Sequence, residues 1–314
     1  MGADQRRATA ALKPQLLRAL TLDAATHPRA QPHVSAASGL VCHAGRVFVV
    51  ADDEHHLAVF DDASAPGRLL PLFEGALPAD ATERKRVKPD CEALLQLPPW
   101  GAAPHGALLA WGSGSRPQRE RGALLRLDRA GAPAGAAEVI DLSGLIAPLR
   151  ERYADLNLEG ALLLGESFVL LQRGTQAGSP NAALHYRAHD LRALLDGRIH
   201  TLAPLDEVRY DLGRLDGLAL GFTDAAALPG GGWAYTAAAE DTDDPYLDGA
   251  CAGSVIGLVN AQGRLGTQWR LAGHDKIEGI AVQADGRRLW ACLVSDADDP
   301  ARAACLWRVV LPLR

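Results

Sequence analysis

The chain has 314 residues, of which 48% are hydrophobic and 22% are charged, and this balance excludes a disordered or fibrous protein. Its formal net charge of −6 provides no basic field for nucleic acid. No apolar run approaches the roughly 20 residues of a membrane-spanning helix. We therefore expect neither a nucleic-acid nor a membrane partner, whereas a protein partner is left open.

The N-terminal segment is a poor secretory signal, because Lys13, Pro14 and Arg18 interrupt its apolar residues. We expect a cytoplasmic protein, with a mature form whose leader was removed as the alternative. The five cysteines are widely spaced and form no Cys-x-x-Cys pair, so we expect packed, reduced thiols rather than a zinc site. Residues 1–12 are predicted to be a flexible tail before one domain that spans 13–314.

One short pattern recurs five times: a polar residue, a small residue and an apolar residue open a strand-like run. The copies are Ser38-Gly39-Leu40, Glu92-Ala93-Leu94, Glu159-Gly160-Ala161, Asp216-Gly217-Leu218 and Glu278-Gly279-Ile280. The small residues are separated by 54, 67, 57 and 62 residues. The chain is therefore predicted to repeat a unit of about 60 residues.

Further apolar runs follow each copy, separated by turns rich in Gly and Asp. In chain order they are 46–50, 57–60, 107–111, 123–127, 137–142, 167–171, 183–186, 207–212, 233–236, 254–259, 288–293 and 305–310, with short helices expected at 146–153 and 190–195. Four antiparallel strands in each repeated unit are typical of a β-propeller blade. The fifth unit has three strands, and we expect the strand 15–22 to complete it and close the ring. The sequence thus predicts a five-bladed β-propeller, with six blades as the alternative.

The innermost strands of a propeller start at the face that also receives the loops between second and third strands. Positions one and three of a strand project to the same side. Four repeats therefore predict a carboxylate ring beside a mixed ring at one mouth of the channel. The carboxylate ring contains Glu92, Glu159, Asp216 and Glu278, and the mixed ring contains Asp90, Asn157, Arg214 and Lys276. Such crowded carboxylates need basic groups, amides or a cation to stay ionised.

Two interpretations of these rings stay open: the residues stabilise the fold, or they form a binding site. As a site, hard oxygen ligands would suit Ca²⁺ or Mg²⁺. The metal-ligand candidates are Glu159, Asp216, Glu278, Asn157 and Glu240, the last from the acidic loop 240–244. The candidates for binding an anionic substrate are Arg173, Arg214, Lys276, Arg86 and Lys88. The catalytic residues are not identified; the weak candidates are His55 and His56, which follow Asp52-Asp53-Glu54, and Glu92.

The openings Asn157-Leu158-Glu159-Gly160 and Lys276-Ile277-Glu278-Gly279 resemble those of bacterial propellers in the phytase-like, or "esterase-like activity of phytase", group. The blade pattern covers nearly the whole chain. The resemblance implies a propeller with acidic residues around the mouth and Ca²⁺-dependent hydrolysis of phosphate or carboxylate esters. The chain departs from that group in its five repeats, its poor signal segment and the absence of a carboxylate from the first repeat.

The leading hypothesis is therefore a Ca²⁺- or Mg²⁺-assisted hydrolase of small phosphate or carboxylate esters, with an anionic small-molecule substrate. The alternative is a non-catalytic ligand- or protein-binding propeller whose carboxylates are structural. A third hypothesis is a lyase that uses His55 or His56 as its base. The chain contains no Gly-x-Ser-x-Gly elbow, phosphate-binding loop or dinucleotide fingerprint.

Overall fold

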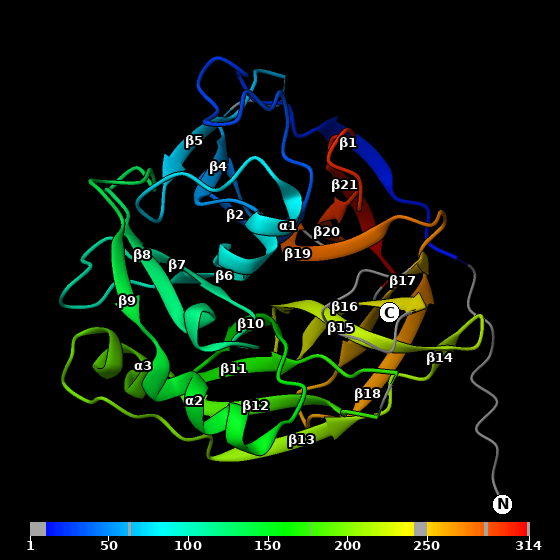
Figure 1. The fold of residues 1–314 in the computed structure, drawn as a ribbon. Coiled ribbons are helices and arrows are strands. Elements are labelled where there is room, and N and C mark those ends of the chain that lie inside the picture. The colour runs from blue at the N-terminus through cyan, green and yellow to red at the C-terminus, as the bar shows by residue number, and fades with distance from the viewer. Residues whose placement is uncertain (1–10, 62–63, 177, 242–249, 286–287, 313–314) are drawn as a thin grey trace, which may run out of the picture.

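The strands of the protein form five sheets around a common centre. The computed structural model describes residues 11–61, 64–176, 178–241, 250–285 and 288–312. Figure 1 shows the sheets arranged as blades, and the innermost strands of neighbouring blades contact one another around the whole ring. The protein is a five-bladed β-propeller, so the predicted fold is confirmed and the six-bladed alternative is wrong.

The first three blades each have four antiparallel strands in chain order from the centre outward. Blade 1 contains β2 (Ala37–His43), β3 (Arg46–Ala51), β4 (His56–Phe60) and β5 (Arg68–Pro71). Blade 2 contains β6 (Cys91–Leu97), β7 (Ala107–Gly112), β8 (Arg121–Arg126) and β9 (Glu138–Asp141). Blade 3 contains β10 (Leu158–Leu164), β11 (Ser167–Gln172), β12 (Asn181–Arg187) and β13 (Asp206–Tyr210).

The last two blades depart from this simple order. Blade 4 contains β15 (Leu218–Ala227), β16 (Trp233–Asp241), β17 (Ala250–Val259) and β18 (Leu265–Arg270), and the two-residue β14 (Arg214–Leu215) pairs with β15. Blade 5 contains β19 (Lys276–Asp285), β20 (Arg288–Asp296), β21 (Cys305–Leu311) and, outermost, β1 (Gln15–Ala19).

The N-terminal strand closes the ring, as predicted. β1 pairs antiparallel with β21, with Gln15 opposite Arg308. This pairing occupies the outer edge of β21, which would otherwise be exposed. Of the predicted tail, residues 1–10 lie outside the described residues. The amide of Leu12 donates a 2.9 Å hydrogen bond to the carbonyl of Arg270. Leu12, which the sequence assigns to the tail, therefore contacts blade 4.

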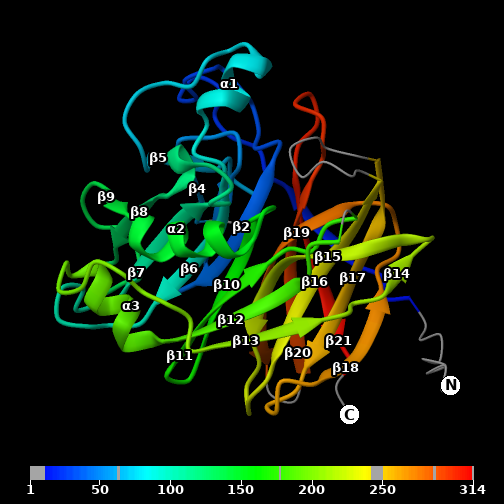
Figure 2. The ribbon, with the colours of Figure 1, turned by 60° about the horizontal axis from the view of Figure 1, so that its bottom comes forward.

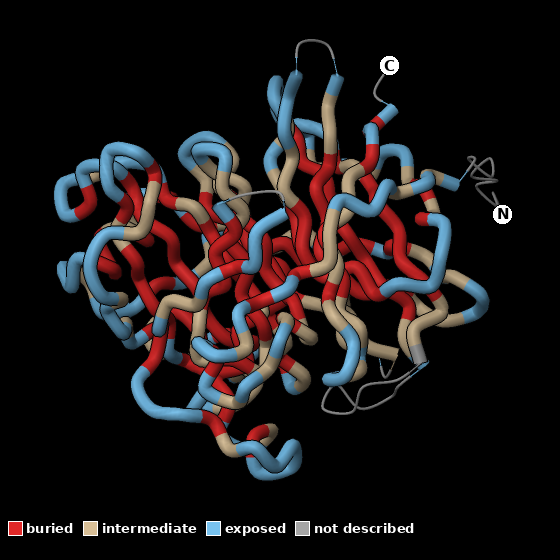
Figure 3. The backbone as a smooth tube through the Cα atoms, turned by 90° about the horizontal axis from the view of Figure 1, so that it is seen from above, coloured by how far each residue is buried: buried red, intermediate tan, exposed pale blue. Residues whose placement is uncertain are grey.

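The hydrophobic core is divided among the five interfaces between neighbouring blades. Each interface buries one cluster of apolar side chains, for example Phe48 and Leu108 between blades 1 and 2, or Phe222 and Val169 between blades 3 and 4. Figure 3 shows the buried strands at the centre and the exposed loops at both faces. Since strand faces alternate, each blade packs apolar side chains on both of its neighbours.

Three short α-helices and one 3₁₀ helix connect the strands. They are α1 (Ala81–Val87), the 3₁₀ helix Pro117–Arg119, α2 (Ser143–Arg152) and α3 (Ala188–Leu195). The last two were expected and complete the core between blades 2 and 3. Figure 2 shows α1, which was not expected, beyond the ends of the strands. Among the described residues, no helix combines the length and apolar character needed to span a bilayer.

Each innermost strand has one β-bulge, where one residue has no partner across the ladder. The bulged residues are Ser38, Glu92, Glu159, Thr223 and Glu278. In four blades this residue opens the recurring sequence pattern. In blade 4 the bulge lies at Thr223, seven residues beyond Asp216.

The expected ring positions of Asp216 and Arg214 are therefore wrong. Asp216 and Gly217 have φ values of 52° and 90° and form the tight turn between β14 and β15, with Leu215 paired to Leu218. Asp-Gly is a favoured pair for a two-residue hairpin because both positions need positive φ. The side chain of Asp216 is 56% exposed and pairs with Arg270 at 2.9 Å.

Candidate functional site

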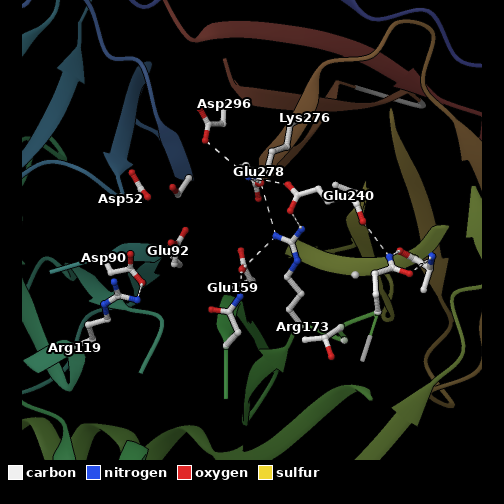
Figure 4. A pocket seen from close by; sticks show the side chains of 18 of the residues that line it. Asp52, Asp90, Glu92, Arg119, Glu159, Arg173, Glu240, Lys276, Glu278 and Asp296 are labelled. Atoms are coloured by element: carbon white, nitrogen blue, oxygen red, sulfur yellow. Dashed lines mark hydrogen bonds and ion pairs between the residues drawn. The ribbon is translucent and has the colours of Figure 1, made fainter. Parts of the chain in front are cut away.

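A polar cavity of about 100 Å³ opens at one mouth of the central channel (Figure 4). Its walls come from the starts of innermost strands and from the ends of second strands, the two sets that the sequence places at one face. The charged lining residues are Asp52, Lys85, Lys88, Asp90, Glu92, Arg119, Glu159, Arg173, Glu240, Lys276, Glu278 and Asp296. The seven carboxylates outnumber the five basic groups, so the lining has a formal charge of −2.

Local structure brings two basic residues of blade 2 to this cavity. The carboxylate of Asp80 caps α1 by accepting a 2.9 Å hydrogen bond from the amide of Glu83. The helix ends at Val87, and Lys88 adopts an extended backbone because Pro89 follows it. Lys85, on the last turn of the helix, and Lys88, just after it, both line the cavity.

Arg173 is the hub of the half of the cavity formed by blades 3 to 5. It lies just after β11 and is buried among three glutamates from three blades. Its guanidinium nitrogens lie 3.3 Å from Glu159 Oε1, 3.0 Å from Glu240 Oε2 and 3.8 Å from Glu278 Oε1. Arg173, a candidate for binding an anionic substrate, therefore pairs with glutamates of the protein itself.

Lys276 supplies the second cation of this half. Its Nζ lies 2.8 Å from Glu240 Oε1 and 3.1 Å from Glu278 Oε1. Asn157 adds a 2.5 Å hydrogen bond to Glu159 Oε1. Most of the negative charge here is therefore compensated by the chain itself, as expected for the structural interpretation of the ring.

The compensation is incomplete at Glu159 and Glu278. Burial raises the pKa of Glu159 to about 8, against the lowering influence of Arg173. Burial also raises the pKa of Glu278, although Lys276 and Arg173 lower it. Glu278 is 4% exposed, and its Oε2 atom has no hydrogen-bond partner in the described part of the chain. For Glu240 burial is outweighed by Arg173 and Lys276, and the pKa is lowered.

The half formed by blades 1 and 2 contains three carboxylates close enough to share a cation. One oxygen each from Asp52, Asp90 and Glu92 lies within 4.8 Å of the others. Asp90 is held by Lys88 Nζ at 3.0 Å and by Arg119 Nη1 at 2.6 Å, and Lys88 also pairs with Asp52. Figure 4 shows this group facing the Arg173 and Lys276 network across the cavity.

Glu92 is the least compensated carboxylate of the three. It faces the cavity at the bulge of β6, and no ion pair or hydrogen bond of its side chain is found within the described ranges. Burial raises its pKa well above the usual value, and the charges of Glu159, Asp90 and Asp52 raise it further, whereas Lys88 lowers it. A cation placed beside it would remove this penalty.

Eight of the thirteen residues predicted for the site line the cavity. They are Glu92, Asn157, Glu159, Glu240, Glu278, Arg173, Lys276 and Lys88. Five do not line it: Asp216, Arg214, Arg86, His55 and His56. Arg214 donates to the carbonyl of Gly217 at 2.7 Å, and Arg86 is exposed on α1.

The two histidines lie outside the cavity on blade 1. His55 Nδ1 is 3.3 Å from the carbonyl of Gly75, and burial lowers the pKa of His55. His56 Nδ1 is 3.7 Å from Glu54 Oε2. Neither imidazole faces the cavity carboxylates, so the geometry provides no support for a histidine base there.

Sequence reasoning placed Asp52 and Asp90 near the mouth but did not identify them as cation ligands. It missed Thr223 and Asp224 altogether. Asp224 occupies the place of the small residue in blade 4 and accepts hydrogen bonds from Ala225 at 2.8 Å and from Ile280 of blade 5 at 2.9 Å. The glycine at position 160 provides room for Asp224, since a Cβ there would lie 2.6 Å from its Oδ1 atom.

The fold and the cavity define a class of protein, a five-bladed β-propeller with a charged pocket at one mouth of its channel. Within that class the chain belongs to a family of unknown function (DUF6929), whose family model matches residues 33–311. This match does not test the resemblance to the phytase-like group, which remains a prediction. A search of curated proteins found no match.

Solved structures with a similar chain path have very different sequences. A luciferin-regenerating enzyme shares 10% identity at a TM-score of 0.47, over 88% of this chain and 92% of that one. Regucalcin from Agrobacterium tumefaciens, a calcium-binding protein, shares 10% identity at a TM-score of 0.47, over 96% of each chain. An α-L-arabinanase of Cellvibrio cellulosa, complexed with arabinohexaose, shares 12% identity at a TM-score of 0.46, over 88% of this chain and 91% of that one. These scores transfer no residue or activity to the present chain.

Proposed function

We propose that the cavity binds a divalent cation through Asp52, Asp90 and Glu92, and that the protein is a metal-assisted hydrolase of small phosphate or carboxylate esters. The observation that carries the proposal is the approach of these three carboxylates to within 4.8 Å at an open polar cavity. Carboxylate oxygens are the ligands that Ca²⁺ and Mg²⁺ prefer. This set replaces the predicted ligands. Of these, Glu159, Glu240 and Glu278 pair with Arg173 and Lys276. Asn157 donates to Glu159, and Asp216 lies outside the cavity.

The charges of the cavity fit a cation better than they fit a free anion. With every carboxylate ionised, the lining has two more carboxylates than basic groups, and Glu92 in particular makes no ion pair in the described ranges. Lys88 is the competing cation, because it already contacts Asp52 and Asp90. We therefore infer that cation binding displaces the Lys88 ammonium from at least one of these carboxylates.

The residues around the cluster provide the remaining functions of a hydrolase. A bound divalent cation would polarise the ester and lower the pKa of a water molecule. Arg119 and Lys85 line the same side of the cavity and would orient an anionic group of the substrate. Burial raises the pKa of Glu159 to about 8, which favours its protonated form, and this carboxyl would donate its proton to the leaving oxygen.

The first test is thermal melting of EDTA-treated protein with added Ca²⁺, Mg²⁺ or Mn²⁺. A cation at about 100 times its dissociation constant adds about 2.7 kcal/mol, which raises Tm by several degrees. Glu92→Gln should abolish this rise while leaving the melting of the metal-free protein nearly unchanged, since Glu92 has no described ion pair to lose. Glu240→Gln, on the other side of the cavity, is the matched control and should keep the rise. If no cation shifts the wild-type Tm, the metal site is wrong.

The second test is hydrolysis of p-nitrophenyl phosphate and p-nitrophenyl acetate with the cation that binds. Turnover that requires the cation and is lost in Glu92→Gln supports the hydrolase. Cation binding without turnover of either ester class favours the alternative, a non-catalytic binding propeller. The observation behind that alternative is the pairing of Glu159, Glu240 and Glu278 with Arg173 and Lys276, which is typical of structural ion pairs.

A further inference from the structure

Two cysteines meet at the seam where the ring closes. Cys42 lies on β2 of blade 1 and Cys292 on β20 of blade 5, and these strands contact each other. Both residues belong to the apolar cluster between the two blades. About 250 residues of chain separate them, and all five cysteines of the protein are free thiols.

The two thiols interact directly. The side chains of Cys42 and Cys292 lie close enough to hydrogen-bond to each other. The second sulfur also lies 4.0 Å from Gln283 Oε1. The hydrogen bond from Cys42 lowers the pKa of Cys292, with Arg308 acting in the same direction against burial. It raises the pKa of Cys42, so Cys292 is the more acidic thiol of the pair.

Cys292 is distinct from the other cysteines. The pKa of each of the other four is raised: by burial at Cys91, Cys251 and Cys305, and by the hydrogen bond to Cys292 at Cys42. The thiolate, rather than the thiol, is the nucleophile in disulfide exchange. Cys292 is therefore the expected attacking sulfur of this pair.

A surface hollow lies beside Cys292. It has a volume of about 480 Å³ and is lined by Gln283, Asp285, Trp290 and Arg308. Gln283 and Arg308 are also the neighbours of the Cys292 sulfur described above. The Arg308 guanidinium stacks over Trp290, with Cζ 4.5 Å from the ring centre. The hollow thus offers a small molecule a cationic group and an aromatic face next to the thiol pair.

We propose that Cys42 and Cys292 form a reversible dithiol–disulfide site that is oxidised by a small anionic disulfide such as glutathione disulfide. The Cys292 thiolate attacks one sulfur of the reagent, which releases the first glutathione as a thiolate and leaves a mixed disulfide. Cys42 then loses its proton to solvent and attacks Cys292, and the second glutathione leaves. The two protein thiols are oxidised, one disulfide is reduced to two thiols, and the protons end on the two glutathiones.

The disulfide would join the first blade to the last by a covalent bond across the seam. Cross-linking distant parts of a chain restricts the unfolded state, and the effect grows with the length of the enclosed loop. The oxidised protein should therefore melt at a temperature higher by on the order of 5 °C. This inference does not depend on the proposed hydrolase.

The experiment is oxidation of the whole chain with glutathione disulfide, followed by intact mass measurement and peptide mapping. We expect a product lighter by two hydrogen atoms, one peptide linking Cys42 to Cys292, and recovery of both thiols with dithiothreitol. Cys42→Ser should retain a stable glutathione adduct on Cys292, whereas Cys292→Ser should leave Cys42 unmodified. Cys305→Ser is the control and should oxidise like the wild type.

Several outcomes would overturn the proposal. One is that both cysteines react with an alkylating reagent as readily after equilibration with glutathione disulfide as before. Another is that either cysteine becomes linked to Cys91, Cys251, Cys305 or a second chain instead. Alkylation of the wild-type protein decides the question even if a serine variant fails to fold.

Discussion

Lys88 Nζ lies 3.0 Å from Asp90 Oδ1, and the same ammonium pairs with Asp52. One side chain therefore contacts two of the three carboxylates that we propose as cation ligands. Burial alone would lower the pKa of Lys88, but Asp52, Asp90 and Glu92 outweigh it and raise the pKa, so the ammonium stays charged. The protein thus holds a tethered cation of its own at the cluster.

Replacing Lys88 with methionine should weaken the metal-free protein and strengthen its response to divalent cations. The substitution keeps the length of the side chain but removes the charge that competes for Asp52 and Asp90. Loss of one partner of a buried pair costs about 3–5 kcal/mol, so the Tm of the EDTA-treated variant should fall clearly. Added Ca²⁺ or Mg²⁺ should then raise the Tm by more than in the wild type.

Lys13→Met, an exposed substitution, serves as the control and should change neither quantity. A Lys88→Met protein that is destabilised and remains unaffected by every divalent cation would show that the three carboxylates accept only an internal ammonium. In that case the cluster has a structural role.

Removing the Arg173 guanidinium should be among the most damaging changes in the cavity. Arg173→Met leaves Glu159, Glu240 and Glu278 without their shared partner, which predicts a loss of about 3–5 kcal/mol in the free energy of unfolding. Urea denaturation would measure it. The loss should shrink in Arg173→Met combined with Glu240→Gln, because one stranded charge is then removed. Equal losses in the single and double variants would contradict the role of Arg173 as the hub.

The number of blades could be predicted because its signals are local. Alternating apolar runs and Gly- or Asp-rich turns mark each strand, and the missing fourth strand of the last unit is matched by the segment near Gln15. The convergence of Glu92, Glu159 and Lys276 follows directly from propeller geometry. α1 was missed because its seven residues lie in a basic stretch with little apolar periodicity.

The residue that blade 4 contributes at the bulge position could not be predicted, because the place of a bulge depends on how the strands pair. Asp216-Gly217 matches the sequence pattern, yet its positive φ values serve a hairpin turn. The bulge falls at Thr223, whose hydroxyl donates to the carbonyl of Ile277 at 2.7 Å. The carboxylate cluster of Asp52, Asp90 and Glu92 was also missed. Asp52 comes from blade 1 and Asp90 from blade 2, and no local sequence pattern shows that they lie close together.

The two aspartates of blade 4 should differ sharply in their effect on stability. Asp224→Ala leaves the buried amides of Ala225 and Ile280 without acceptors, which predicts a loss of roughly 2–4 kcal/mol. Asp216→Asn keeps a residue that tolerates positive φ and removes one exposed ion pair, so its loss should stay within about 1 kcal/mol. Urea denaturation of both variants checks the assignment. A larger loss for Asp216→Asn would place the inter-blade contact at the turn instead.

The raised pKa of Glu159 should make the metal-free protein less stable as the pH rises from about 4.5 to about 8. Burial raises this pKa from 4.5 to about 8 in the folded protein, so within that window the folded state binds a proton that the unfolded state has released. The contribution of this proton to stability is fully present below about pH 4.5. It is lost at up to about 1.4 kcal/mol per pH unit as the pH approaches 8.

Glu159→Gln carries no titrating proton and should flatten this part of the stability profile. The variant should be more stable than the wild type at pH 8.5 and differ less from it at pH 5.5, as measured by urea denaturation in EDTA at several pH values. Glu166→Gln, on an exposed turn, should follow the wild-type profile. Parallel profiles for the wild type and Glu159→Gln would mean that Glu159 is ionised in the folded protein. The proton donor of the proposed hydrolysis would then have to be another residue.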